Sequence, residues 1–525
     1  MSLLSPEERR TLIALSRLAY ANPFLPERIA LEREVLEEAF VWTDAAWHRR
    51  IDMDGQPPNI DLLTRKVSGL IAKLRRRWLA GERVSDREAR LYEDAVLFYL
   101  YNRHHPSFNE LLHEVDGAGR YPRCEAPFYR EFLQDLEHYF GLPPVPSVSS
   151  SATFVSLEES VHLFACFYQL RRAFHFIHGN ILGGSMSAAR FRASVWESIF
   201  TRDMRRYQRS LYNRMEDIAT LITGPSGTGK ELVAQAIGYA PYIPFDPSRL
   251  RFVKDYRASY HPLNLAAFSP TLIESELFGH KKGAYTGALE DRLGWFEVCG
   301  PHGSVFLDEV GDIDPAIQVK LLRIIQNRTF QRIGDTATYI FEGKLVSATS
   351  RDLAADMRAG RFREDLYYRL CSDIIETPSL RDQIRETPEH LHHLILYIAQ
   401  RVGGEEEYES LAHEAETWIH EHLGDDYPWD GNVRELEQCV RNIMVRQSYR
   451  PPSVRAATAR EELAAAVVDA RLTSDELLRH YFTLVYGETR NYSEAARRLD
   501  VDARTVKGHV DHSLLERYGL GAPSG

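Results

Sequence analysis

The chain has no apolar run long enough to cross a bilayer. The most apolar stretch, residues 161–182, is interrupted by Arg171, Arg172, His175 and His178. The first ten residues, MSLLSPEERR, carry charges where a signal peptide needs an apolar segment. We therefore expect a cytoplasmic protein that does not associate with membranes.

Cysteine is scarce, and its spacing excludes a disulfide framework or a zinc site. The five cysteines lie far apart and form neither a CxxC pair nor a zinc-ligand spacing. This distribution favours free thiols in a reducing compartment. Histidines at positions 104, 105, 390, 392 and 393 form two local clusters, for which we expect solvated or capping side chains rather than metal ligands.

An excess of basic charge is also missing. The sequence has 64 Lys and Arg against 75 Asp and Glu, which gives a net charge of −11. This balance excludes a surface that coats nucleic acid with basic residues, but it allows a small DNA-binding module. Hydrophobic residues make up 44% and charged residues 26%, so the chain is neither fibrous nor mostly disordered. At about 150 residues per domain, 525 residues predict three or four domains.

The chain divides into segments of different pattern. Apolar residues three and four apart, such as Leu12, Leu15 and Leu18, predict helices up to about residue 141. A segment rich in Gly, Pro and Ser follows, and mixed α/β and helical patterns come next. The predicted segments are a helical domain at 1–141, a linker and connecting helix at 142–182, an α/β domain at 183–377, a helical region at 378–446, a linker at 447–470, and three short helices at 471–518.

A glycine-rich loop, GPSGTGK at residues 224–230, lies between a short apolar run and a helical pattern. Glycines let backbone N–H groups point toward a phosphate, and the helix N-terminus adds partial positive charge. Lys230 would reach the terminal phosphates of a nucleotide. Glu231 stands where a Ser or Thr that contacts Mg²⁺ is usual. A chance glycine loop is the alternative, and the strand–loop–helix context argues against it.

An apolar strand pattern at residues 303–309 ends in two adjacent carboxylates, Asp308 and Glu309. An ATP-hydrolysing site needs one carboxylate near Mg²⁺ and one to orient or deprotonate the attacking water. We assign Asp308 to the metal and Glu309 to the water. A simple helix cap is the alternative, which the preceding phosphate loop disfavours.

Seven blocks, in order, resemble the AAA+ domain of bacterial sigma-54-dependent transcriptional activators. They are GPSGTGKE (224–231), ESELFGH (274–280), GAYTGA (283–288), FLDEVGD (306–312), QVKLLR (318–323), GRFREDLYYRL (360–370) and GNVREL (431–436). The resemblance covers about residues 183–446 and, more loosely, the last 50. It implies an α/β P-loop ATPase core with a helical lid at 378–446. Glu231 is the residue that this family carries after the lysine.

The resemblance also implies the site residues. ATP would bind to Gly224, Pro225, Ser226, Gly227, Thr228, Gly229, Lys230, Glu231, Thr349 and Arg434. A surface loop would contact the sigma-54 factor through Gly283, Ala284, Tyr285, Thr286, Gly287 and Ala288. Two departures concern Tyr285, where phenylalanine is usual, and Ser350, where relatives usually have asparagine and where nucleotide sensing is in question.

Three further residues take implied catalytic roles. Asn264 matches the position that couples the catalytic glutamate to the state of the substrate. Arg363 and Arg369 match residues that relatives present to the nucleotide of a neighbouring subunit, where a guanidinium neutralises charge on the transferred phosphate. Such arginines act across subunits, so a homo-oligomeric ring, a hexamer, is expected. A pair of ordinary surface arginines is the alternative.

The last segment resembles the short helix-turn-helix domain that ends most of these activators. Residues 473–476, TSDE, form a capping-box pattern, and the pair Ala495-Ala496 allows close helix approach. If the third helix enters the major groove, four residues face the DNA: Arg504, Thr505, Lys507 and His509. Between residues 471 and 517 there are eight basic and eight acidic residues, so one copy would attract phosphate weakly. A three-helix interaction domain is the alternative.

The sequence therefore predicts an ATP- and Mg²⁺-dependent activator that remodels the sigma-54 RNA polymerase holoenzyme and binds upstream promoter DNA. Two alternatives remain open: a DNA-binding regulator that keeps the fold without acting on sigma-54, and a remodelling ATPase with another protein target. The N-terminal region has no receiver-type pattern of strands ending in paired aspartates. We expect it to be a helical regulatory domain whose signal the sequence does not name.

Overall fold

A computed structural model describes residues 3–42, 58–117, 124–142, 156–451, 463–464, 466–467 and 472–518. Residues 143–155 of the predicted linker and connecting helix at 142–182 lie outside the described residues, as do residues 452–462, 465 and 468–470 of the predicted linker at 447–470. The chain forms two compact units, Met1–Val445 and Arg446–Gly525, each described by itself. None of the helices in the described part is both long enough and apolar enough to span a bilayer.

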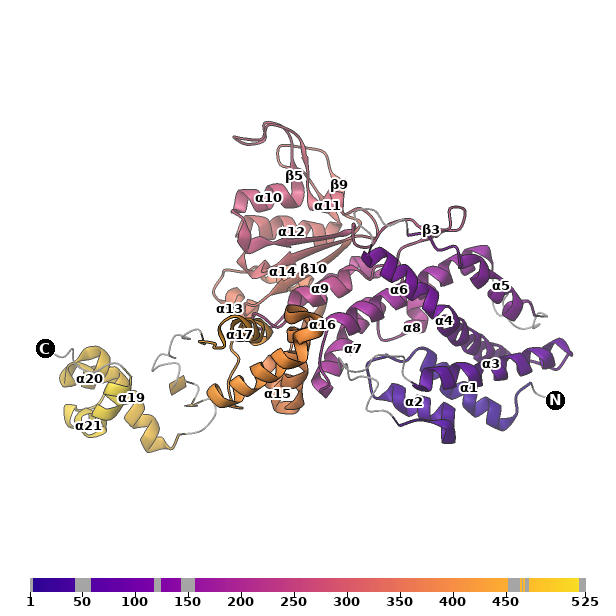
Figure 1. The fold of residues 1–525 in the computed structure, drawn as a ribbon. Coiled ribbons are helices and arrows are strands. Elements are labelled where there is room, and N and C mark those ends of the chain that lie inside the picture. Colours follow the sequence, from indigo (N-terminus) through magenta and orange to yellow (C-terminus); the bar gives the residue numbers. More distant parts are fainter. Residues whose placement is uncertain are drawn as a thin grey trace. The chain divides into compact units, whose positions relative to one another are not determined.

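The N-terminal region is helical, as the apolar periodicity predicts (Figure 1). Its helices are α1 (Pro6–Ala19), α2 (Glu27–Leu36), α3 (Pro58–Leu79), α4 (Asp86–Gly117) and α5 (Tyr129–Phe140). Ser5 begins α1 with a capping box, in which its hydroxyl accepts from Glu8 N and the Glu8 carboxylate accepts from Ser5 N. Leu12, Leu15 and Leu18 are buried on the face that the spacing predicts.

Helix α6 (Leu157–Asn180) joins the N-terminal helices to the α/β region. Phe164 is fully buried, with its ring centroid 5.1 Å from that of Phe108 on α4 and 5.0 Å from that of Tyr129 on α5. On the other side it lies 4.7 Å from Phe245 and 5.9 Å from Phe252, in the hairpin β2 (Phe245–Asp246) and β3 (Arg251–Phe252). One continuous hydrophobic core therefore includes both regions.

The α/β region contains five parallel strands in the order β11-β1-β10-β7-β4. Their bounds are β1 (Thr220–Thr223), β4 (Tyr260–Asn264), β7 (Ser304–Asp308), β10 (Lys344–Thr349) and β11 (Asp373–Glu376). Thr223 is in register with Thr349, and Asn264 with Asp308. The ends of four strands thus meet at one edge of the sheet, where ligands bind in open α/β folds.

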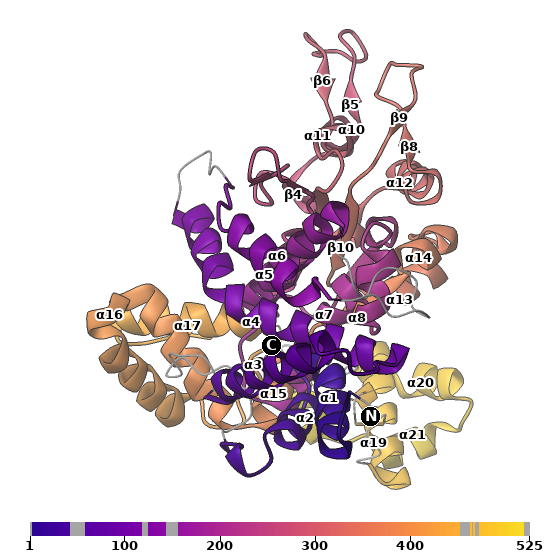
Figure 2. The same ribbon diagram turned by 90° about the vertical axis from the view of Figure 1, so that its right-hand side faces the viewer.

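Helices on both faces cover this sheet, and two hairpins extend from it. The helices are α7 (Met186–Phe200), α8 (Met204–Arg206), α9 (Lys230–Gly238), α10 (Pro270–Phe278), α11 (Trp295–Val298), α12 (Pro315–Asn327), α13 (Leu353–Arg358) and α14 (Glu364–Leu370). The hairpins are β5 (Gly279–His280) with β6 (Arg292–Leu293), and β8 (Thr329–Phe330) with β9 (Tyr339–Ile340). Figure 2 shows both hairpins projecting from the core in the same direction.

The helical region that follows the sheet contains α15 (Leu380–Glu386), α16 (Glu389–His422) and α17 (Asn432–Arg446). Gly404 has φ 76° within α16 and separates two helical stretches, a conformation that glycine adopts without steric cost. The expectation of solvated histidines is wrong for His390 at the start of α16 and for His104 on α4, since both are buried. The His104 ring lies 2.9 Å from a carboxylate oxygen of Asp135.

Within the described residues 472–518, the C-terminal unit has four short helices where the sequence predicted three. They are α19 (Ser474–Thr489), α20 (Tyr492–Leu499), α21 (Ala503–His509) and α22 (His512–Arg517). The fourth forms because the Asp511 carboxylate accepts from the backbone N–H groups of Ser513 and Leu514. The spacing of Val501, Val506 and Val510 predicts that all three pack inward, but only Val506 is fully buried, with Ala495, while Val501 is exposed.

We predict that Phe164→Ala destabilises the protein by about 3–5 kcal/mol, because it removes a ring that contacts both halves of the core. The measurement is chemical unfolding of the full chain. Leu157→Ala on the same helix is the control, since Leu157 is exposed and its loss should cost less than about 0.5 kcal/mol. Equal effects of the two substitutions would contradict a shared core built on α6.

Candidate functional site

The phosphate loop lies between β1 and α9, as the sequence predicts. Gly224, Gly227 and Gly229 all have positive φ, at 138°, 79° and 87°, where a side chain would strain the backbone. The Lys230 ammonium is buried and donates to the carbonyls of Gly224 and Pro225 at 2.9 and 3.0 Å. Lys230 thereby bonds back to the start of its own loop.

Burial lowers the pKa of Lys230, and the nearby carboxylates of Glu309 and Asp308 partly offset this effect. An anion bound in the loop would add a further opposite charge. The site is therefore electrostatically prepared for phosphate, since its cation is held away from water beside backbone N–H groups. Glu231, the next residue, is exposed on the first turn of α9.

The helical region contacts the phosphate loop directly. The Asn432 amide donates to Ser226 O at 2.9 Å, and its oxygen accepts from Leu380 N at 2.9 Å. The Arg434 guanidinium donates to the Ser226 hydroxyl at 3.2 Å. A Cβ on Gly227 would lie 2.2 Å from Gly431 O, so only glycine permits this close approach. Arg434 is thus placed over the loop, where the sequence resemblance expects it.

The acidic pair lies at the end of β7 beside the loop. Asp308 is the last residue of the strand, and Glu309 has a left-handed backbone with φ 54° and ψ 48°. A non-glycine residue in this region stores about 1 kcal/mol or more of strain and aims its side chain differently from the strand. Burial raises the pKa of Asp308, and repulsion from Glu309 raises it further.

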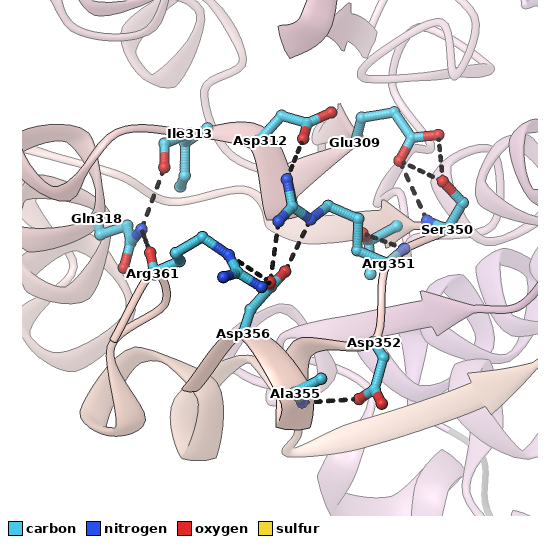
Figure 3. Close-up of polar contacts among 11 residues, drawn as sticks. Glu309, Asp312, Ile313, Gln318, Ser350, Arg351, Asp352, Ala355, Asp356 and Arg361 are labelled. Atoms are coloured by element: carbon cyan, nitrogen blue, oxygen red, sulfur yellow. Dashed lines mark hydrogen bonds and ion pairs between the residues drawn. The ribbon is translucent and has the colours of Figure 1, made fainter. Parts of the chain in front are cut away.

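Glu309 is held by Ser350. The Glu309 carboxylate accepts from Ser350 N at 3.1 Å and from the Ser350 hydroxyl at 3.0 and 3.1 Å, as Figure 3 shows. Asn264, expected to be coupled to Glu309, instead donates to Asp308 at 3.3 Å. The residue that departs from the family pattern therefore orients the candidate water-activating carboxylate in this structure.

Thr349, which the resemblance assigns to nucleotide binding, is buried inside the protein. It is the last residue of β10 and is fully buried, and its hydroxyl accepts from Arg351 N at 3.1 Å. Its assignment to nucleotide binding stays a prediction. The exposed neighbour Ser350 has the hydroxyl that reaches the acidic pair.

The two candidate trans-acting arginines lie on the outside of the molecule. Arg363 is the N-cap residue of α14 and Arg369 lies in its last turn, and both are exposed. The Arg363 guanidinium donates to both carboxylate oxygens of Asp365, at 2.9 and 2.6 Å. This ion pair would have to open for Arg363 to reach another subunit.

The GAYTGA segment forms the tip region of the β5–β6 hairpin. Gly283 and Gly287 have positive φ, and Gly283 N donates to Ala288 O at 2.8 Å, which closes the loop. Thr286 is exposed. The Tyr285 hydroxyl donates to Ser275 Oγ at 3.4 Å, and its ring centroid lies 5.1 Å from that of His280. The hydroxyl that distinguishes tyrosine from phenylalanine therefore holds this ring against the base of the hairpin.

The four candidate DNA-contacting residues on α21 differ in their surroundings. Arg504 and Lys507 are exposed. The Thr505 hydroxyl donates to the Asp502 carboxylate at 2.9 Å, within the helix cap. The His509 ring is partly buried and lies 4.9 Å from the ring of Phe482. Of the four, Arg504 and Lys507 are therefore the exposed residues, while Thr505 and His509 make contacts within the unit.

Comparison with known proteins finds a match to a known domain in part of this chain. Residues 200–376 match the Sigma-54 interaction domain. This domain contains the phosphate loop, the acidic pair, the GAYTGA hairpin and both candidate trans-acting arginines. The match confirms the resemblance to sigma-54-dependent activators that the sequence motifs indicated.

Individual relatives agree with the domain match. The chain is 37% identical to the transcriptional regulatory protein ZraR of Salmonella typhimurium over 298 residues, which are 55% of this chain and 62% of that protein. It is 42% identical to the Nif-specific regulatory protein of Azotobacter vinelandii over 225 residues, 43% of this chain and 39% of that protein. The alignments thus span roughly half the length of these curated relatives.

Among solved structures, NtrX from Brucella abortus in complex with ATP is similar at 23% identity and a TM-score of 0.39, over 70% of this chain and 74% of that chain. A structure of the same protein in complex with ADP is 19% identical with a TM-score of 0.38, over 75% and 80% of the two chains.

Sequence reasoning missed three residues that the structure brings into the site. Ser350 was noted only as a departure, Asn432 only as part of GNVREL, and Gln318 only as part of QVKLLR. Each is polar, and each contacts a functional segment distant in sequence. The buried polar residues Asn432 and Gln318 could have been suspected from their place inside amphipathic helices.

We predict that Asn432→Gly weakens nucleotide affinity about tenfold. Asn432 has φ 53°, which glycine adopts without strain, so this change removes the amide bonds to Ser226 and Leu380 and keeps the backbone. Fluorescent nucleotide titration measures the effect. Asn442→Gly, at a partly exposed position of α17, is the control for helix destabilisation. Equal affinities of both variants and the parent chain would show that the lid contact is irrelevant to binding.

Proposed function

We propose that the chain is an ATP-hydrolysing, DNA-binding activator of transcription that remodels the sigma-54 RNA polymerase holoenzyme at promoters. The observation that carries the proposal is the site within the matched Sigma-54 interaction domain: Lys230 in the phosphate loop lies on the same sheet edge as Glu309, which Ser350 orients. The named relatives are transcriptional regulatory proteins, which agrees with this function.

The residues present fit ATP with Mg²⁺. The loop offers backbone N–H groups, a helix N-terminus and a buried ammonium to the phosphates. Mg²⁺ at such sites takes one or two carboxylates together with phosphate oxygens and water. Asp308 fits that role, because the repulsion that raises its pKa would be relieved by a cation. Bound Mg²⁺ would neutralise charge on the phosphates, while Glu309 accepts a proton from the attacking water.

Hydrolysis would require a neighbouring subunit. Arg363 and Arg369 are exposed on α14, where a neighbouring subunit could contact them. In a homo-oligomeric ring, which we take to be a hexamer, they would reach the next subunit's phosphates and neutralise the charge that develops there. The Arg363–Asp365 ion pair is largely exposed, and because water screens such pairs, little opposes its opening.

The hairpin and the C-terminal unit would supply the two macromolecular contacts. An exposed Thr286 between two glycines at the end of a projecting hairpin offers a small contact surface for sigma-54. Arg504 and Lys507 on α21 are available to bases or phosphates of upstream DNA. The other candidates, a DNA-binding regulator without action on sigma-54 and an ATPase with another target, lack a comparable observation in their favour.

We predict that Lys230→Ala and Glu309→Gln fail in different ways. Lys230→Ala removes the cation from the loop and should abolish ATP binding. Glu309→Gln keeps the shape of the side chain but removes the base, so ATP should bind while turnover falls about 100-fold or more. Equilibrium nucleotide binding and steady-state hydrolysis measure these effects. Hydrolysis by Glu309→Gln at the parent rate would show that another group activates the water.

We further predict that Thr286→Ala uncouples hydrolysis from promoter opening. Thr286 lies on the projecting hairpin, away from the phosphate loop, so ATP turnover should stay within about twofold of the parent chain. Opening of a sigma-54 promoter should be lost, as measured by permanganate footprinting with purified holoenzyme. Thr417→Ala, exposed on α16, is the matched control. A Thr286→Ala variant that opens promoters normally would remove the main support for sigma-54 as the target.

A further inference from the structure

Gln318 on α12 holds the chain segment that leads to Arg363. Its side chain is fully buried, and its amide group makes three hydrogen bonds. The amide nitrogen donates to Ile313 O at 3.1 Å and to Arg361 O at 3.0 Å (Figure 3), and the amide oxygen accepts from Arg363 N at 2.8 Å. One side chain thereby joins the segment after Glu309 to the segment that ends at Arg363.

Asp356 on α13 holds the same segment from its other side. Its carboxylate, only 4% exposed as a residue, accepts from the Arg351 guanidinium at 2.7 and 2.9 Å and from the Arg361 guanidinium at 2.9 and 2.5 Å. Its carbonyl accepts from the N–H groups of Arg361 and Phe362. The Arg351 contact lowers the pKa of Asp356, with a further contribution from Arg361, so the carboxylate stays charged.

Both attachments lead back to the candidate catalytic glutamate. Arg351 also donates to Asp312 at 2.8 Å, and Asp312 precedes Ile313 in the loop that begins at Glu309 (Figure 3). Ser350, adjacent to Arg351 in the chain, binds the Glu309 carboxylate. Residues 309–313, 350–351 and 361–363 are therefore connected by hydrogen bonds into one polar network, in which Gln318 and Asp356 are the buried members.

We propose that Gln318 and Asp356 are positioning residues that fix Arg363 relative to the loop of Glu309. Through these two residues, the position of the Glu309 loop in one subunit determines the position in which that subunit presents Arg363 to the neighbouring subunit. This inference rests on the proposed function, because it takes Arg363 to act on a neighbouring nucleotide. The physical reason is rigidity: the network fixes the backbone before α14, and a displacement of about 1 Å at a reacting group can lower a rate 100-fold.

The test compares Gln318→Leu with Gln326→Leu in the full chain. Leucine keeps the volume of Gln318 but removes all three hydrogen bonds, whereas Gln326 is exposed two turns later on α12. For Gln318→Leu we expect kcat to fall about 10- to 100-fold with KM for ATP within about threefold of the parent, because the variant's own phosphate loop is intact. For Gln326→Leu both constants should stay unchanged.

Mixed rings give a readout that a merely structural defect would not produce. Lys230→Ala subunits bind no ATP but present an intact Arg363, so mixing them with Gln318→Leu subunits should restore hydrolysis. Arg363→Ala subunits bind ATP but present no guanidinium, so mixing them with Gln318→Leu subunits should restore none. A misfolded variant would be rescued by neither partner.

Should Gln318→Leu fail to fold, Arg361→Ala provides the second variant, since the Arg361 side chain is 60% exposed and removing it leaves the core intact. It should show the same pattern of rescue. If Arg363→Ala hydrolyses ATP at the parent rate, the trans-acting arginine of the proposed function is wrong. If Arg363→Ala is inactive while Gln318→Leu and Arg361→Ala match Gln326→Leu, the positioning role is wrong and the proposed function stands.

Discussion

Five parallel strands end at one edge of a sheet, and the candidate chemistry depends on this constraint. β1 leads into the phosphate loop, β7 into Asp308 and Glu309, β10 into Ser350, and β4 into Asn264. Because parallel strands place their carboxyl ends together, Glu309 meets Ser350, 41 positions away, and Asn264 meets Asp308, 44 positions away, within hydrogen-bonding distance. The helices and the lid then only have to orient groups that the sheet has already gathered.

Orientation is achieved mainly by polar side chains that bridge distant segments. Ser350 sets the direction of the Glu309 carboxylate, and Asn432 connects the lid to the phosphate loop. Gln318 joins two loops from a buried position on α12. Asn432 and Gln318 also satisfy backbone groups that would otherwise lack partners, and a buried group without a partner costs about 1–3 kcal/mol. Truncating such a side chain would therefore change both the geometry of the site and the stability of the fold. For this reason the proposed variants keep either the side-chain volume, as in Gln318→Leu, or the backbone conformation, as in Asn432→Gly.

The sequence predicted which residues lie at the edge of the sheet better than it predicted which of these residues contact one another. Glycine spacing and the position of Lys230 identify a phosphate loop because that chemistry requires those residue types in that order. Partner choice is different: nothing local to Glu309 indicates that it binds Ser350 rather than Asn264, because the choice depends on the register of β10 beside β7. The burial of Thr349 follows from the same register.

The N-terminal region was the least predictable part. Its helices were visible in the spacing of Leu12, Leu15 and Leu18, but apolar faces do not specify their partners, so the shared core around Phe164 could not be derived. The same holds for α22, where a single Asp511 cap decides whether a fourth helix forms. Since the N-terminal helices share a core with the sheet region, a signal received there could act on the site through packing.

The central claim is that energy from ATP hydrolysis in this domain opens sigma-54 promoters. The most direct measurement uses the purified parent chain with sigma-54 holoenzyme on closed and on premelted promoter DNA. Open complexes on closed DNA should require ATP and should not form with a non-hydrolysable analogue, whereas premelted DNA should lower that requirement. Equal open-complex formation with and without hydrolysable ATP on closed DNA, or none with either, would contradict this account.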